Sequence, residues 1–365
     1  MKNKKRLTTI ATIAVLAAAA FIYLASHNTS NGVKIGAVFP LTGDVASYGR
    51  AAQRGIDLGV AEINAAGGIG GQPIEILYED DQNQPSTAIN ALRKLVSVDR
   101  VQAVLGSAAS SVTLALCPVA KENQVVLVTP ISSSPELTTQ GGDFFFRVCP
   151  SDVLQAKLMA EWLHEEKFSR VALLYVNNSW GQGLRVEFQT AFSTHDGTII
   201  AQEACNEGDL DLRTQISKLK ESNPDVVYAI TYGREGGAFL RQAQELGLSV
   251  PVFGADVWGS SELRETAGDT ARGVRIYAPA SFSGPRYETF VRQFKERNGE
   301  DPDVYAAYAY DMVHIVAQAI RTSESEGITV RDALVDTEYD GVTGMTRFDE
   351  HGDVIGKGFE RRKLK

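Results

Sequence analysis

Short apolar runs alternate along the chain with stretches whose hydrophobic residues recur every three or four positions. Most of the runs are apolar almost throughout, as expected of strands that are buried on both faces of a parallel sheet. Between them lie predicted helices such as 50–64, where Ala52, Ile56, Val60 and Ile63 share one face. This alternation predicts an α/β fold with doubly wound parallel sheets. The eight predicted strands are Val33–Phe39, Ile74–Tyr78, Val101–Leu105, Val125–Thr129, Val171–Val176, Thr198–Glu203, Val226–Ile230 and Pro251–Phe253.

Eight strand–helix units are too many for one compact sheet with a single switch point, so we divide them into two lobes. The boundary is expected near Arg147–Ser151, where Cys149-Pro150 interrupts the pattern before a predicted helix over 152–167. The chain has no internal repeat, low-complexity tract or Pro/Ser-rich linker. We therefore expect short crossings between the lobes that act as hinges.

The N-terminal segment is treated separately from the fold. Four basic residues within 2–6 precede an uncharged stretch from Leu7 to Ser26, which is the arrangement of an export signal. A retained membrane anchor is the alternative, because the stretch is close to the ~20 residues that a spanning helix needs. We favour a cleaved signal within residues 1–30, and no cysteine lies near its end to carry a lipid. Either interpretation places the body in the periplasm or at the outer face of the cytoplasmic membrane.

Composition and charge limit the kinds of molecule that the protein is expected to bind. The 365 residues include 36 Lys and Arg against 45 Asp and Glu, a formal net charge of −9, with 44% hydrophobic residues. This is an ordinary globular composition. Without the four basic residues of the export segment the body carries −13, which argues against a nucleic-acid partner or an anionic membrane surface.

Three cysteines, Cys117, Cys149 and Cys205, show no CxxC or metal-ligand spacing. An oxidising compartment permits one disulfide and leaves an odd thiol. The sequence does not choose a pair, and the alternative is that all three are small buried residues.

Enzyme motifs are absent from the expected places. The glycines within Gly67–Gly71 follow a helix and precede a strand, whereas a dinucleotide-binding loop follows a strand and opens a helix, so a helix C-cap and turn is the better interpretation. There is no GxSxG elbow and no P-loop, and the five histidines are scattered. Asp80 and Asp81 are adjacent at a strand end and are expected to point to opposite faces. We therefore expect no enzyme, no cofactor and no metal site.

Polar and aromatic residues are concentrated just after the carboxyl ends of the predicted strands, where open α/β sheets bind ligands. Each has an ordinary alternative: a helix N-cap, a turn residue, a solvated charge or an aromatic packed under a loop. Six such residues at one edge, three from each half, are what two lobes closing on one ligand would require. They are Tyr48, Ser110 and Ser133 from the first half and Trp180, Tyr232 and Asp256 from the second.

A set of short motifs follows in order over nearly everything after residue 31. The motifs are Val33-Lys34-Ile35-Gly36, Pro40-Leu41-Thr42-Gly43, Tyr48-Gly49, Ile63-Asn64, Gly67-Gly68-Ile69, Tyr78-Glu79-Asp80-Asp81, Thr129-Pro130, Pro135-Glu136-Leu137, Gly181-Gln182-Gly183, Leu240-Arg241-Gln242-Ala243 and Phe348-Asp349. This set in this order resembles the leucine/isoleucine/valine-binding protein family, the periplasmic receptors of branched-chain amino-acid ABC transporters.

The resemblance implies a type 1 periplasmic binding protein fold, in which two Rossmann-like lobes are joined by three hinge crossings. It implies that the chain returns to the first lobe near 278–281 and crosses again near 340–344. The expected N-terminal lobe is then 31–149 with 280–340, and the expected C-terminal lobe is 150–279 with 341–365.

The resemblance also implies roles for site residues. Ser110 matches the serine that binds the ligand carboxylate through its hydroxyl and N–H. At the ammonium end, Ser133 replaces a threonine, Ile131 supplies a backbone carbonyl, and Asp256 replaces a glutamate and keeps its charge.

The aromatic positions of the family are retained. Tyr48 and Tyr232 match directly, and Trp180 replaces a tyrosine, which preserves stacking but removes a hydroxyl. Small residues at Ala108 and Ala109 leave room beside the site, so we expect an aliphatic or aromatic guest.

We therefore expect a monomeric transport receptor that binds a free α-amino acid, closes by hinge motion and presents the closed form to an ABC permease. A sensory receptor of the same fold, or a receptor for an amide or small carboxylate, is the alternative. A hydrolase or dehydrogenase lacks its motifs here, and a DNA-binding regulator would need a helix-turn-helix where the export segment lies.

Overall fold

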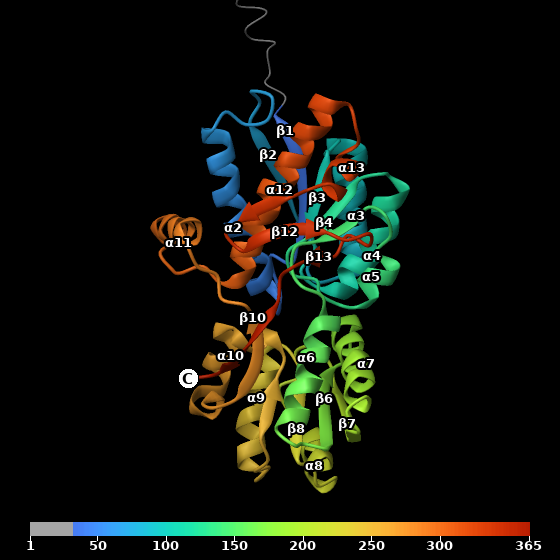
Figure 1. Cartoon of the computed structure of the whole chain (residues 1–365), viewed down its shortest axis with the longest axis vertical. Coiled ribbons are helices and arrows are strands. Elements are labelled where there is room, and N and C mark those ends of the chain that lie inside the picture. Colours follow the sequence, from blue (N-terminus) through green and yellow to red (C-terminus); the bar gives the residue numbers. More distant parts are fainter. Residues whose placement is uncertain (1–31) are drawn as a thin grey trace, which may run out of the picture.

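Residues 32–365 are described in a computed structural model, which consists of two α/β lobes stacked along the long axis of the molecule (Figure 1). The export segment predicted in residues 1–30 lies outside the described residues. Among the helices described, none is both long enough and apolar enough to cross a bilayer.

The first lobe, at the top of Figure 1, is built on a sheet of five parallel strands in the order β2-β1-β3-β4-β5. Its central strands β3 and β4 are entirely buried because helices cover both faces. The strands are β1 (Val33–Phe39), β2 (Ile74–Asp80), β3 (Ala103–Gly106), β4 (Val126–Thr129) and β5 (Phe145–Arg147).

Helices from both ends of the chain cover this sheet. The long α12 packs along α2, so that residues more than 240 positions apart in sequence share one core, as in the hydrogen bond between Tyr310 and Glu62. The helices are α2 (Ala46–Ala65), α3 (Pro85–Lys94) with a π-helical turn at Leu95–Asp99, α4 (Ser110–Glu122), α5 (Glu136–Gln140), α11 (Pro285–Asn298), α12 (Val304–Glu326) and α13 (Val330–Val335).

The second lobe is built on a six-stranded sheet in the order β14-β10-β9-β8-β6-β7, parallel except for β14. Its strands are β6 (Arg170–Val176), β7 (Thr198–Cys205), β8 (Val226–Ile230), β9 (Val252–Gly254), β10 (Arg275–Pro279) and β14 (Phe359–Lys363). Its helices are α6 (Asp152–Glu165), α7 (Ser179–Ser193), α8 (Arg213–Glu221), α9 (Gly233–Glu245) and α10 (Ser261–Ala267), with 3₁₀ turns at Asp256–Gly259 and Gly268–Ala271.

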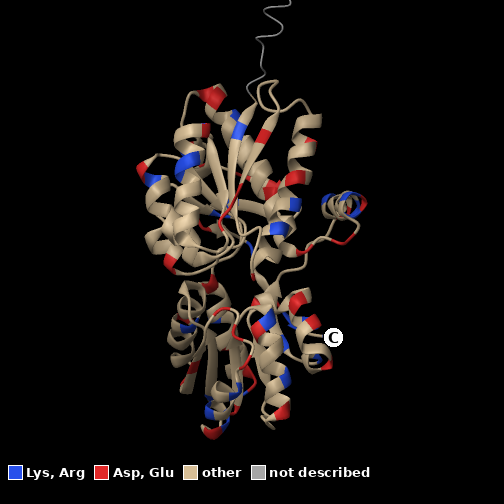
Figure 2. Cartoon of the chain, turned by 180° about the vertical axis from the view of Figure 1, so that it is seen from behind, with Lys and Arg blue, Asp and Glu red and all other residues tan. Residues whose placement is uncertain are grey.

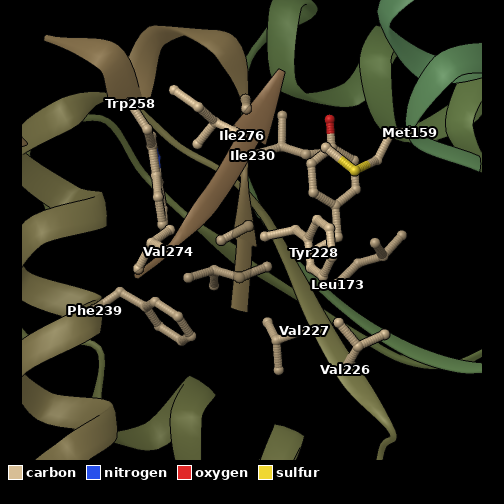
Figure 3. Packing of buried hydrophobic residues seen from close by; sticks show 14 of the residues in the cluster. Met159, Leu173, Val226, Val227, Tyr228, Ile230, Phe239, Trp258, Val274 and Ile276 are labelled. Atoms are coloured by element: carbon tan, nitrogen blue, oxygen red, sulfur yellow. The ribbon is translucent and has the colours of Figure 1, made fainter. Parts of the chain in front are cut away.

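Figure 3 shows how the core of the second lobe is filled from several elements. Tyr228 and Ile230 of β8 lie among side chains of β6, α6 and β10, and Trp258 packs on the side of α9. All of the labelled residues except Val274 are fully buried. Large apolar side chains of this kind each contribute about 1.5–3 kcal/mol when they are removed from water.

Both lobes have the same internal strand order. In chain order the first sheet reads 2-1-3-4-5, and the parallel part of the second, β7-β6-β8-β9-β10, reads the same. Each sheet therefore has its switch point beside its first strand, between β1 and β3 and between β6 and β8. Ligands bind at such points, beyond the carboxyl ends of the strands. The expected fold of two Rossmann-like lobes is confirmed.

Three strands of the two main sheets, β5, β10 and β14, were not predicted because none has the pattern of a buried strand. β5 has three residues and ends in Arg147, and β10 begins with Arg275 and ends with Pro279. Arg147 is nevertheless fully buried, because its guanidinium pairs with Asp353 at 2.6 Å and donates to the Ser134 carbonyl.

The C-terminal boundary differs from the expected one. The strands β11 (Tyr339–Gly341), β12 (Gly344–Phe348) and β13 (Val354–Ile355) form a small antiparallel sheet on the first lobe. The buried Asp311 carboxylate accepts from the Val342 and Thr343 backbones, and Asp353 pairs with Arg147. These buried charges need partners, which holds residues 341–355 to the first lobe. The placement of all of 341–365 in the second lobe, with a crossing near 340–344, is therefore wrong: the chain crosses between β13 and β14.

All three cysteines are free and buried among residues 32–365, so no disulfide joins them there. Burial raises the pKa of the Cys117, Cys149 and Cys205 thiols to about 12. The buried-residue interpretation holds for all three. Figure 2 shows acidic and basic residues scattered over the helices and loops of both lobes.

Candidate functional site

One cavity between the lobes is lined by every site residue named from the sequence. The space between the lining atoms amounts to about 460 Å³, part of which is open to solvent. The predicted residues that line it are Tyr48, Ser110, Ile131, Ser133, Trp180, Tyr232 and Asp256. They are joined by residues that sequence reasoning did not place in the site: Val45, Val257 and Tyr305, with Ala108 and Ala109 as the expected small neighbours.

The common strand order of the two lobes explains this convergence. Tyr48 lies in the first turn of α2 after β1, and Trp180 lies at the corresponding place in α7 after β6. Ser110 follows β3, and Tyr232 follows β8. These four residues therefore flank the two switch points and face each other across the gap between the lobes.

One end of the cavity presents hydrogen-bond donors. Ser110 is the first residue of the 13-residue helix α4, whose leading N–H groups have no partner within the helix. Its Oγ accepts from the Ser134 backbone N–H at 3.2 Å, which leaves the hydroxyl hydrogen available to a bound group. A helix N-terminus with a free hydroxyl is suited to an anion such as a carboxylate.

The other end presents acceptors. The Ser133 hydroxyl donates to Asp152 Oδ2 at 2.8 Å, so its lone pairs remain for a donor in the cavity. Asp256 contributes a carboxylate from the 3₁₀ turn after β9. Its backbone N–H donates to Gln155 Oε1 at 2.9 Å, and Gln155 Nε2 donates to Oδ1 of the same aspartate at 3.1 Å.

The electrostatics of this end follow from two buried carboxylates held close together. Burial raises the pKa of Asp152, and the negative charge of Asp256 raises it further. Burial likewise raises the pKa of Asp256, against the lowering effect of the Gln155 amide. Arg147 lowers the Asp152 pKa only in part, because its guanidinium is already paired with Asp353. This end of the cavity therefore has an excess of negative charge that a bound cation would neutralise.

Aromatic rings form the walls. Trp180 stacks on Tyr232 with ring centroids 4.9 Å apart and planes at 17°. Tyr48 lies 6.1 Å from Tyr232 and packs edge-on against Tyr305 at 5.3 Å. The Tyr48 hydroxyl is buried and has no hydrogen-bond partner among residues 32–365, so it remains available to a ligand.

Polar contacts close the cavity at its rim. Asn83 of the first lobe donates to Glu207 of the second at 2.6 Å, and Arg234 pairs with Asp44 at 2.5 Å. Asn178 also donates to Glu207 and to the Tyr232 hydroxyl. The two lobes therefore adopt a closed arrangement, in which their rims are in contact.

Tyr305, Asp152 and Gln155 are the main residues that sequence reasoning missed. Tyr305 lies near the start of α12, preceded by the N-cap Asp303, and does not follow a strand. Asp152 and Gln155 are fully buried polar residues in α6. Nothing in the sequence marks them as buried, because such residues are mostly exposed on helices.

Two motifs that were set aside have structural roles. Gly68 donates to the Ile63 carbonyl beyond the end of α2, with φ of 101° at Gly67 and 72° at Gly68, which confirms the C-cap and turn. Asp80 accepts from the Leu41 backbone N–H, and Asp81 is buried and accepts from Ser107 Oγ at 2.6 Å.

Comparison with known proteins agrees with the architecture. A family model described as "Periplasmic binding protein" matches residues 32–359. A leucine-, isoleucine-, valine-, threonine- and alanine-binding protein of Pseudomonas aeruginosa is 30% identical over 344 residues, which cover 93% of this chain and 92% of the relative.

Solved structures show the same likeness. The branched-chain amino acid transporter substrate binding protein LivJ of Streptococcus pneumoniae, in complex with isoleucine, superposes with a TM-score of 0.81 at 30% identity, over 91% of this chain and 100% of the other. The leucine binding protein LivK of Thermotoga maritima superposes with a TM-score of 0.82 at 28% identity, over 91% and 95%. The resemblance to leucine/isoleucine/valine-binding proteins is confirmed, and the chain belongs to the periplasmic binding protein family.

Proposed function

We propose that this chain is the extracytoplasmic solute-binding receptor of an ABC transporter, and that it binds a free α-amino acid between its lobes. The observation that carries the proposal is the opposite polarity of the two ends of one cavity. Ser110 and the α4 N-terminus offer donors, whereas Ser133 and Asp256 offer acceptors and negative charge.

A zwitterion satisfies both ends at once. The carboxylate would accept from the Ser110 hydroxyl and the α4 N–H groups. The ammonium would pair with Asp256 and donate to Ser133 Oγ and to the Ile131 carbonyl. An enclosed ammonium is costly unless it is paired and hydrogen-bonded, and this end of the cavity provides both.

The rest of the cavity favours an aliphatic or aromatic side chain. Val45, Ala108 and Val257 line it together with Tyr305, and none of these residues carries a charge. Burial of an apolar side chain against them contributes about 25 cal/mol per Å² of area removed from water.

A ligand without an ammonium fits less well. A simple carboxylate or an amide would leave the Asp256 carboxylate without an opposite charge in the cavity, with the Gln155 amide as its side-chain donor, at a cost in desolvation. This argues against the alternative of an amide or carboxylate receptor.

We further propose that the body acts in the periplasm or at the outer membrane face, as a monomer that presents its closed form to a permease. The support is the export segment in the sequence and the family, in which relatives are named as binding proteins and transporter components. Size-exclusion chromatography with light scattering of the mature chain tests the monomer.

The ligand class is tested by a thermal-shift screen against the twenty amino acids, their amides and matching 2-hydroxy acids, followed by calorimetry of each hit. A ligand that binds the native state raises Tm by mass action. We expect the largest shifts from L-amino acids with aliphatic or aromatic side chains. Stabilisation by amides or hydroxy acids alone would contradict the proposal.

A further inference from the structure

Asp152 lies behind the cavity wall rather than in it. It is the first residue of α6, is fully buried, and does not line the cavity. Both carboxylate oxygens are engaged: Oδ2 accepts from Ser133 Oγ at 2.8 Å, and Oδ1 accepts from Gln155 Nε2 at 2.7 Å.

The direction of the first of these hydrogen bonds determines what Ser133 offers to the cavity. Above neutral pH, where Asp152 is ionised, its carboxylate can only accept, so the serine hydroxyl donates its single hydrogen to Asp152. The Ser133 oxygen can then offer only lone pairs to a group in the cavity.

Gln155 makes this arrangement unambiguous. Its Oε1 accepts the Asp256 backbone N–H at 2.9 Å, which places Nε2 toward the carboxylates. The two Nε2 hydrogens go to Asp152 and to Asp256, at 2.7 and 3.1 Å. The amide is therefore fully used, and neither of its hydrogens is left for the cavity.

We propose that Asp152 is a positioning residue that holds Ser133 as a pure acceptor, and that the preference for an α-amino acid over the matching α-hydroxy acid depends on it. The inference rests on the proposed function. An ammonium has only donors and needs acceptors, whereas an alcohol can donate or accept and would tolerate either orientation of Ser133.

Replacing Asp152 by Asn reverses the direction of the hydrogen bond between residue 152 and the Ser133 hydroxyl. The Gln155 amide still needs an acceptor, so Asn Oδ1 faces Gln155 and Asn Nδ2 faces Ser133. Ser133 then accepts from Nδ2 and turns its own hydrogen into the cavity, toward the ligand ammonium.

The test is a double-mutant cycle with Asp152→Asn, Ser133→Ala and the double variant. The Kd values of L-leucine and of its 2-hydroxy analogue are measured by calorimetry at pH 8. We expect Asp152→Asn to lower the preference for leucine by roughly tenfold to hundredfold, the effect of a hydrogen bond to a charged group. In the Ser133→Ala background the same substitution should change that preference less than threefold, because the hydroxyl through which it acts is absent.

Asp225→Asn is the matched control. Asp225 accepts from the Ser169 and Arg170 backbones just before β8, at the end of the sheet opposite the cavity. The Asp225→Asn substitution should leave the preference for leucine over its 2-hydroxy analogue unchanged. If Asp152→Asn does not fold, as judged by circular dichroism, Asp152→Ala takes its place in the cycle, because it also frees the serine hydrogen.

The outcomes separate the two proposals. A wild type that does not bind leucine more tightly than the hydroxy acid overturns the proposed function and the inference with it. A wild type with that preference, but equal effects of the Asp152 substitution with and without the Ser133 hydroxyl, overturns the inference alone, because Asp152 would then act through its charge.

Discussion

Two serines in this cavity have opposite roles because their neighbours differ. Ser110 Oγ accepts from a backbone N–H, which leaves its hydrogen free, whereas Ser133 Oγ donates to a carboxylate, which leaves its lone pairs free. The residue type alone would permit either role. At the residue scale, the polarity of the site is therefore set by atoms one layer behind the cavity.

The amino acid to test is the one that gives the largest thermal shift. Asp256→Ala should weaken its binding free energy by about 2–5 kcal/mol, since an enclosed ammonium would lose its opposite charge. Isothermal titration calorimetry measures the change. Asp269→Ala, at an exposed position of the same lobe, is the control and should leave Kd unchanged. A loss of affinity of less than tenfold for Asp256→Ala would contradict the binding of the ammonium at this end of the site.

Ligand binding should release protons below neutral pH. In the free protein, burial raises the pKa values of Asp152 and Asp256, and the charge of Asp256 raises that of Asp152 further, so this pair retains protons that ordinary aspartates have lost. A bound ammonium lowers those pKa values, so the complex holds fewer protons and affinity rises with pH through that range. Calorimetry in buffers of different ionisation enthalpy should show proton release at about pH 6 and almost none at about pH 8.

The same pair affects the stability of the free protein with a defined sign. A carboxyl whose folded pKa is raised binds more protons in the native than in the unfolded state, so the free energy of unfolding falls as pH rises through the interval between the two pKa values. The Asp256→Asn variant should lose part of this fall. An identical pH dependence of Tm in the variant and the wild type would contradict the coupling.

At the scale of elements, the site depends on the close approach of helices that are remote in sequence. Tyr48 of α2 meets Tyr305 of α12 in the wall of the cavity. The two helices can come this close because α2 has a glycine at the contact: a Cβ built at Gly55 would lie 2.1 Å from the Ala306 carbonyl oxygen.

Gly55→Ala should therefore destabilise the protein by about 1–3 kcal/mol, the usual cost of overpacking, although alanine is the better helix former. Differential scanning calorimetry should show a lower Tm. Gly259→Ala is the control, because a Cβ there would meet only Ile276 at an ordinary 3.7 Å. A Tm for Gly55→Ala at or above that of the wild type would show that the helices separate without cost.

At the scale of the molecule, polar contacts at the rim of the cavity join the two lobes. The Asn83–Glu207 hydrogen bond and the Asp44–Arg234 ion pair join opposite rims. The ion pair is largely exposed, with side-chain exposures of 71% and 39%, so its contribution is small. A ligand that fills the space between the lobes can then shift the equilibrium toward the closed form.

The double variant Asn83→Ala/Arg234→Ala should raise the amino-acid Kd by about fivefold, the loss of roughly 1 kcal/mol of closure contacts. Most of the change should be in the dissociation rate, measured by stopped-flow fluorescence. Arg213→Ala/Asn298→Ala is the matched control, because these residues bond within one lobe each, to Glu245 and to the Phe294 carbonyl. Equal dissociation rates for the two double variants would show that the rim contacts do not hold the lobes closed.

Much of the fold could be predicted from the sequence because its signals are local. Buried parallel strands such as β1 and β8 are continuous apolar runs, and their alternation with amphipathic helices indicates doubly wound sheets. Strands β5, β10 and β14 are short or carry charges, so their pairing partners, rather than their own residues, make them strands.

The sequence by itself determined the class of the fold, the edge of each sheet where a ligand would bind, and seven residues that line one cavity. Only the tertiary structure decided the direction of the hydrogen bonds at Ser110 and Ser133, the inclusion of Tyr305, and the attachment of residues 341–355 to the first lobe. The physical reason is that strand ends follow from local periodicity, whereas the partners of buried polar groups such as Asp152 and Arg147 come from elements that meet only when the chain has folded.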